Sequence, residues 1–233
     1  MTLFASFHPT LQEVLISGLG WSSLRPVQEE TYRAVCEGAD VVVLAPTAGG
    51  KTESAFIPVL DHLLKDAPSG IAAIYLSPLK ALINDQEDRI RQMCERAGLS
   101  VASQHGDVAA RDRWKFSREG ELPHILLTTP ESLEVLLGDP ESRSAFSRVR
   151  FVIIDEIHAF METDRGVHLR CLLDRLETSH MVQRIGLSAT VGNPQDLLAW
   201  MSAPGRNQRL VQIPSPSSSK QFSFVVEREF SAQ

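Results

Sequence analysis

The chain has 233 residues, of which 43% are hydrophobic and 22% are charged, and its formal net charge is -6 at pH 7. This composition is typical of a globular protein and excludes disordered, collagen-like and low-complexity chains. The length is enough for one large domain whose core needs no disulfide or structural metal. Excess negative charge disfavours non-specific binding of polyanions, although it permits a local nucleic-acid site.

The number of cysteines and the length of the apolar runs indicate the cellular compartment. The three cysteines lie far apart, at Cys36, Cys94 and Cys171, without the spacing of a metal site. Reduced thiols in a cytoplasmic setting are therefore expected. No run approaches the roughly 18 apolar residues of a membrane span, and the N-terminus lacks the pattern of a signal peptide.

Short apolar runs alternate with longer helical patterns along the chain. Seven runs are rich in β-branched residues and leucine, and they lie at 41–45, 71–77, 101–105, 124–129, 150–156, 184–190 and 209–213. Apolar character on both faces of each run is typical of strands in a parallel sheet covered on both sides. In the helical stretch 165–177, leucines recur at a spacing of three or four residues. The alternation predicts an α/β fold, doubly wound, with right-handed crossovers.

The two ends of the chain differ from this pattern. Residues 1–38 are expected to form an N-terminal helical segment, with helices at about 10–18 and 26–37. Residues 39–213 are expected to form the main domain. Residues 214–233 begin with a Pro/Ser-rich linker and end in a strand-like stretch without an evident partner. The sequence therefore predicts that the natural protein continues beyond Gln233.

A glycine-rich segment after the first run predicts a phosphate-binding loop. The segment APTAGGKT (45–52) follows a strand pattern and precedes a helical one. Small residues let backbone N–H groups surround phosphates at a helix N-terminus. Lys51 is expected to reach the terminal phosphates of ATP, and the Thr52 hydroxyl to bind Mg²⁺. The alternative is a chance glycine-rich turn. The candidate nucleotide-binding residues are Pro46, Thr47, Ala48, Gly49, Gly50, Lys51 and Thr52.

Two carboxylates end the apolar run 150–156. In a doubly wound sheet the carboxyl ends of the strands are where ligands bind. Asp155 is predicted to hold Mg²⁺, and Glu156 to orient and deprotonate the attacking water. With Lys51 these residues are the catalytic candidates. The alternative is an acidic pair at the start of a helix.

The motifs together are similar to those of superfamily 2 helicases. The phosphate loop, the DEIH box at 155–158 and the triplet Ser188-Ala189-Thr190 have the order and spacing of that superfamily. Four further segments, at 24–28, 77–82, 105–107 and 128–133, resemble the Q motif, motif Ia, a strand-end motif and motif Ib. The DEIH box followed by RGVHL (165–169) resembles the Lhr-type (large helicase-related) branch.

This resemblance implies a RecA-like P-loop NTPase domain with a mostly parallel sheet and helices on both faces. It implies ATP and Mg²⁺ as cofactors and 3′-to-5′ translocation on single-stranded or duplex DNA. It also implies a second RecA-like domain, in cis or in a partner chain, that supplies arginine fingers. The start of that domain is expected in residues 214–233, so weak hydrolysis is expected without the rest of it.

The resemblance also assigns roles to residues outside the phosphate loop. Gln28 would read the adenine edge, and Phe4, Phe7 or Trp21 could stack on the base. Residues implied to couple the two sites are His158, Ser188, Ala189 and Thr190. Residues implied to contact nucleic acid are Pro78, Leu79, Lys80, Gly106, Thr128, Thr129, Pro130 and Glu131.

Each of these roles has a structural alternative. Lys80 and Gln28 could simply begin helices, and Thr128 and Thr129 could end a strand with capping hydroxyls. His158 could be an ordinary core or surface histidine. The basic and aromatic cluster at 111–118 could stack on single strands or form a solvated helix. At the level of function, the alternatives are an RNA helicase or RNA–protein remodeller, and a nucleotide-binding interaction module that never translocates.

Overall fold

The computed structural model describes residues 3–46, 50–105, 122–177, 180–189 and 191–212. Within them lies a seven-stranded sheet in the order β3-β4-β2-β5-β6-β1-β7, and every neighbouring pair is parallel. The strands are β1 (Asp40–Leu44), β2 (Ala73–Leu76), β3 (Val101–Gln104), β4 (Ile125–Thr128), β5 (Phe151–Ile154), β6 (Gln183–Ser188) and β7 (Gln208–Gln212). Each overlaps one of the seven predicted runs, so the doubly wound parallel fold is confirmed.

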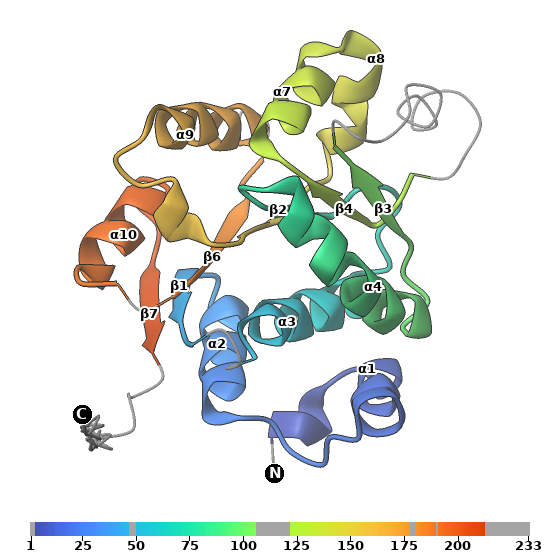
Figure 1. Cartoon of the computed structure of the whole chain (residues 1–233). Coiled ribbons are helices and arrows are strands. Elements are labelled where there is room, and N and C mark those ends of the chain that lie inside the picture. The colour runs from blue at the N-terminus through green and yellow to red at the C-terminus, as the bar shows by residue number, and fades with distance from the viewer. Residues whose placement is uncertain (1–2, 47–49, 106–121, 178–179, 190, 213–233) are drawn as a thin grey trace, which may run out of the picture.

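Helices cover both faces of the sheet (Figure 1). One face carries α1 (Pro9–Glu13), α2 (Pro26–Cys36), α3 (Lys51–Asp66) and α4 (Lys80–Arg96). The other carries α7 (Pro130–Gly138), α8 (Pro140–Arg143), α9 (Asp164–Leu176) and α10 (Pro194–Met201). Along β1, Val41 and Val43 belong to the first core, whereas Val42 and Leu44 belong to the second. This alternation of side chains buries both faces of the strand.

The two edge strands correct one expectation. Strands β1, β2, β4, β5 and β6 are buried throughout, but β3 is partly exposed and β7 is mostly exposed. The expectation that every run is buried on both faces is therefore wrong for β3 and β7. An edge strand has a sheet neighbour on only one side, so its side chains are covered less completely.

The N-terminal segment packs onto the first core. Its predicted helix at 10–18 is divided into α1 and a π-helical turn, η2 (Val14–Gly18), while the predicted helix at 26–37 is α2. The buried carboxylate of Asp61 in α3 accepts hydrogen bonds from the His8 N–H at 2.7 Å and the Tyr32 hydroxyl at 2.5 Å. The described part of this segment therefore shares its core with the main domain.

The remaining elements are short 3₁₀ turns. They are η1 (Leu3–Ser6), η3 (Ser144–Phe146) and η4 (Ile157–Ala159). Among the described helices, none combines the length and the apolar character needed to cross a membrane. Several predicted features lie outside the described residues: Thr47, Ala48, Gly49, Gly106, Thr190, the cluster at 111–118, and the linker and strand-like stretch of 214–233.

Candidate functional site

The motif segments meet at one edge of the sheet because all the strands are parallel. The neighbouring strands β1, β6 and β5 end at the phosphate loop, the Ser188 triplet and the DEIH box. The neighbours β2, β4 and β3 end at the segments that resemble the nucleic-acid motifs. Strands β5 and β2 are adjacent, so the two groups are continuous along the carboxyl edge, where doubly wound folds bind ligands.

Lys51 begins α3 directly after Gly50, whose φ of 79° lies in the left-handed region that favours glycine. The Lys51 side chain is buried, and its Nζ lies 3.5 Å from Glu156 Oε1. This Nζ makes no hydrogen bond to the described residues. A buried ammonium with unused donors is suited to an anion such as a nucleotide phosphate. Thr52 follows Lys51 in α3 and is partly buried.

Asp155 is held by two hydrogen bonds. Its Oδ2 accepts from the Tyr75 hydroxyl at 2.5 Å, and its Oδ1 accepts from the Glu156 N–H at 3.0 Å. Burial raises the pKa of Asp155, and the hydrogen bond from Tyr75 opposes that rise. Burial also raises the pKa of Tyr75 well above its ordinary value, so Tyr75 stays protonated and donates. The carboxylate is therefore fixed in orientation at the end of β5.

Glu156 links the predicted catalytic residues to the predicted coupling residues. Its backbone has a φ of 43°, a left-handed conformation that costs a non-glycine residue about 1 kcal/mol. Its Oε2 lies 3.4 Å from His158 Nδ1, which in turn is 3.0 Å from Ser188 Oγ. The contacts run without a break from Lys51 through Glu156 and His158 to Ser188. Ala189, next in the chain, contributes its carbonyl oxygen, which accepts from Ser188 Oγ at 2.8 Å.

Gln28 lies against the phosphate loop. Its side chain is fully buried, and its Oε1 accepts from the Arg25 N–H at 2.9 Å. Its Nε2 has no hydrogen-bond partner among the described residues and would be 3.1 Å from a Cβ placed on Gly50. One donor of Gln28 is therefore unused beside the loop, while its acceptor is already occupied by the backbone.

A small cavity of about 90 Å³ adjoins the start of α3. Phe7 is buried in the core, and both Phe4 and Trp21 pack against that core. Of these three aromatic candidates, Trp21 also lines the cavity, together with Gly50 and Lys51. The sequence spacing of the three aromatic residues did not indicate which of them could stack on the base. The structure brings only Trp21 to this cavity.

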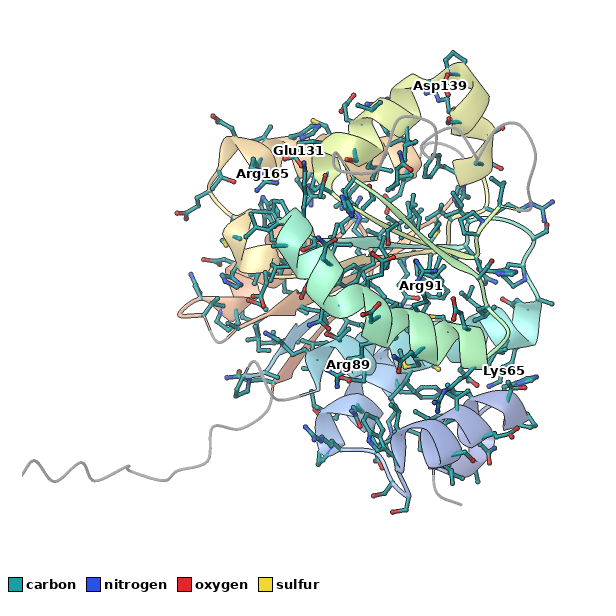
Figure 2. The ribbon with its side chains drawn as sticks, turned by 45° about the vertical axis from the view of Figure 1, so that its right-hand side comes forward. Lys65, Arg89, Arg91, Glu131, Asp139 and Arg165 are labelled. Atoms are coloured by element: carbon teal, nitrogen blue, oxygen red, sulfur yellow. The ribbon has the colours of Figure 1, made fainter. Side chains whose placement is uncertain are left out.

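An ion pair beside the cavity was not predicted from the sequence. Glu53, buried in the first turn of α3, pairs with Arg89 of α4, and both line the cavity. Figure 2 labels Arg89 on α4. Glu53 directly follows Thr52 in the sequence, and this position beside the phosphate loop could have indicated that Glu53 belongs to the site. Nothing local indicates Arg89 as its partner, because the two residues meet only when α3 and α4 pack on the same face of the sheet.

A groove of about 1020 Å³ lies at the ends of β2, β3 and β4. Its lining includes Pro78, Leu79 and Lys80 on one side and Thr129 and Glu131 on the other. Leu79 is 57% exposed, and Lys80 begins α4 at the surface. The structure thus brings five of the predicted nucleic-acid residues to one groove.

Thr128 and Pro130 are placed differently from these five. Thr128 is fully buried, and its hydroxyl donates to the Gln104 carbonyl at 2.6 Å, which corrects the expectation that it would offer a donor to nucleic acid. Pro130 is the buried first residue of α7. Thr129 Oγ1 accepts from the Ser132 N–H at 3.3 Å and so caps α7, as the structural alternative predicted. Of the residues 128–131, Thr129 and Glu131 line the groove.

The chain is similar to known helicases in sequence and in fold. The family model described as DEAD/DEAH box helicase matches residues 25–197. An Lhr helicase of Mycolicibacterium smegmatis is 37% identical over 217 residues, covering 87% of this chain and 14% of that protein. The ATP-dependent helicase Lhr-Core of Methanothermobacter thermautotrophicus is 41% identical over 173 residues, covering 66% of this chain and 20% of that protein.

Among solved structures, the Mycobacterium smegmatis helicase Lhr bound to ssDNA and AMP-PNP superposes with a TM-score of 0.81 at 32% identity. It covers 92% of this chain and 28% of that one. The chain thus spans a small part of the relatives that it matches. The α/β fold is that of RecA-like helicase domains, and the segment matched by the family model extends from Arg25 in the Q-motif segment past Ser188. By these matches the chain belongs to the DEAD/DEAH box helicase family.

Proposed function

We propose that this chain is the ATP-binding half of a helicase motor that acts on single-stranded DNA. The observation that carries the proposal is the continuous series of contacts from Lys51 through Glu156 and His158 to Ser188. That series lies at the same sheet edge as the groove lined by Lys80 and Glu131. A motor needs a nucleotide site and a polynucleotide site that communicate, and a shared edge provides that proximity.

The side chains present fit ATP and Mg²⁺. Lys51 Nζ and Gln28 Nε2 are buried donors without partners among the described residues, so both suit the acceptor atoms of a nucleotide. The oriented Asp155 carboxylate and the Thr52 hydroxyl are the hard oxygen donors that Mg²⁺ prefers. ATP supplies the phosphoanhydride bond whose hydrolysis drives translocation. Glu156 is positioned to orient and deprotonate the attacking water, and a second RecA-like domain would supply the arginine that stabilises the developing charge.

DNA is favoured over RNA by the bound ligand of the similar Lhr structure, which is ssDNA. In the groove, the cation at Lys80 suits backbone phosphates rather than base edges. Contacts of that kind hold a strand without reading its sequence, which a translocating protein requires.

The test is a titration of the chain with a fluorescent ATP analogue in Mg²⁺, alone and with oligo-dT or oligo-U. We expect saturable nucleotide binding that oligo-dT tightens and oligo-U tightens less. An equal or larger effect of oligo-U would replace DNA by RNA in the proposal. Nucleotide binding that responds to neither oligonucleotide, in this chain and in the whole protein, would instead indicate an interaction module.

Tyr75 provides a test of the Mg²⁺ assignment. A Tyr75→Phe variant removes the hydroxyl that holds Asp155 Oδ2 and keeps the ring in the core. We expect the Mg²⁺ concentration for half-maximal nucleotide binding to rise about three- to tenfold, because partners that orient a metal ligand contribute to metal affinity. The measurement is a Mg²⁺ titration at a fixed concentration of the ATP analogue.

Tyr32→Phe is the matched control. Tyr32 is also a buried tyrosine whose hydroxyl donates at 2.5 Å to a buried aspartate, Asp61, but this pair joins α2 to α3 away from the DEIH box. Both variants lose one hydrogen bond, so general destabilisation affects both. If the two variants shifted the Mg²⁺ requirement equally, or neither did, the role given to Tyr75 would be wrong.

A further inference from the structure

Arg165 joins three segments that are far apart in sequence. Its Nε donates to Glu131 Oε1 at 2.8 Å, and its NH2 donates to the Pro78 carbonyl at 2.8 Å. Its guanidinium carbon lies 5.5 Å from the centre of the Phe160 ring, within cation–π range. Figure 2 shows Arg165 and Glu131 side by side at the groove, which both residues line. Arg165 therefore contacts both walls of the groove and the segment that follows the DEIH box.

The start of α9 is built to place Arg165 there. A Cβ on Gly166 would lie 2.0 Å from the Phe160 carbonyl oxygen, so only glycine lets the helix approach this backbone. Thr163 caps the helix, since its Oγ1 accepts from the Gly166 N–H at 3.1 Å and donates to the Phe160 carbonyl at 2.7 Å. These constraints hold the start of α9 against Phe160 and explain why a glycine follows Arg165.

The charge of Glu131 is maintained by its surroundings. Partial burial raises the pKa of Glu131, but hydrogen bonds from its own backbone and from Arg165 outweigh that effect and lower the pKa. The carboxylate is thus ionised and paired at neutral pH. Glu131 Oε1 lies 2.8 Å from Arg165 Nε and 2.7 Å from its NH2, and the same NH2 donates to the Pro78 carbonyl. Serving both partners in this geometry uses two nitrogens of the planar arginine fork, whereas a lysine has one nitrogen to offer.

We propose that Arg165 is a positioning residue for the nucleic-acid groove, holding the segments 78–80 and 129–131 at a set separation and tying both to the segment after the DEIH box. This inference rests on the proposed function. It assigns a role to Arg165, which the sequence indicated only as part of the RGVHL segment that resembles the Lhr-type branch. Phe160 follows Asp155 by five positions through η4, so the contact gives the nucleotide side a direct physical path to the groove.

The experiment measures oligo-dT affinity of the chain by fluorescence anisotropy, with and without saturating Mg²⁺ and ATP analogue. We expect Arg165→Lys to weaken oligo-dT binding about three- to tenfold, since one arm of a half-exposed charge-assisted contact is lost. We expect the nucleotide to change oligo-dT affinity less than in the wild type. Nucleotide affinity without oligo-dT and the melting temperature are expected to remain those of the wild type, which separates positioning from a general structural role.

Glu131→Gln tests the same contact from the other side. If Arg165 and Glu131 act as a unit, the double variant should bind oligo-dT no more weakly than the weaker single variant. Independent, additive losses would show that each residue touches the strand by itself and would overturn the positioning role. If Arg165→Lys fails to fold, Glu131→Gln alone keeps the test, because a positioning pair predicts weaker oligo-dT binding and unchanged or tighter binding would overturn the role.

Arg175→Lys is the matched control. Arg175 also lies on α9 and pairs with a glutamate of α7, its NH1 being 2.5 Å from Glu134 Oε1, but neither residue lines the groove. We expect this variant to bind oligo-dT like the wild type. Wild-type affinity in Arg165→Lys would overturn the inference alone, whereas a wild-type chain that binds ATP but no oligonucleotide would overturn the proposed function and the inference with it.

Discussion

A Lys51→Ala variant is expected to bind ATP about 10- to 100-fold more weakly than the wild type, the equivalent of one charge-assisted hydrogen bond of about 1.5–3 kcal/mol. The Lys51 ammonium is buried and makes no hydrogen bond to the described residues, so its donors are available for phosphate. Its loss also leaves Glu156 without the cation 3.5 Å away. Hydrolysis by the whole protein should fall further than binding, because the negative charge on the transferring phosphoryl group increases in the transition state.

Lys65→Ala is the control for this prediction. Lys65 lies in the last turn of the same helix, α3, where it pairs with Asp61 at 2.6 Å and is 46% exposed. Asp61 keeps its bonds from the His8 N–H and the Tyr32 hydroxyl when this lysine is removed. Titration with a fluorescent ATP analogue should give wild-type affinity for Lys65→Ala. Equal affinities of all three proteins would mean that the phosphate loop is not the nucleotide site.

The largest loss of stability is expected at Asp40, the first residue of β1. Its fully buried carboxylate accepts from the Arg184 N–H and from the Ala203 N–H, each at 2.9 Å, and lies 3.5 Å from the Arg206 guanidinium. Asp40→Ala leaves two backbone donors and a mostly buried cation without their acceptor. We expect the free energy of unfolding to fall by about 3–5 kcal/mol. Urea unfolding that compares midpoints at constant slope measures this change.

Two further variants make the stability test specific. Asp40→Asn keeps one acceptor oxygen and should lose about half as much free energy of unfolding. Asp66→Ala removes a carboxylate that pairs with Arg150 at the surface, and it should lose less than about 1 kcal/mol. A loss at Asp40→Ala no greater than that at Asp66→Ala would show that these buried bonds do not hold β1 in place. The position matters for function because β1 leads into the phosphate loop.

The strands and the phosphate loop could be predicted because their signals are local. A buried parallel strand needs a short, continuous apolar run, and the seven runs correspond to the seven described strands. Asp155 and Glu156 could be named because they end such a run, and Lys51 and Thr52 because a short glycine-rich segment joins them to one. Parallel pairing takes the carboxyl ends of these runs to one edge. The expectation that β3 and β7 are buried on both faces was wrong because no single run indicates which strands lie at the edges of the sheet.

The sequence by itself determined the α/β class, the seven strands and the motif residues at their carboxyl ends, because hydrophobic periodicity and turn chemistry act between near neighbours. Only the tertiary structure decided which distant side chains meet. Tyr75 reaches Asp155 across 80 positions, and Arg165 reaches Pro78 across 87. It also decided that the Thr128 hydroxyl bonds to the Gln104 carbonyl and that the Thr129 hydroxyl caps α7. Such pairings depend on strand order, helix approach and burial, which arise when the whole chain packs around its two cores.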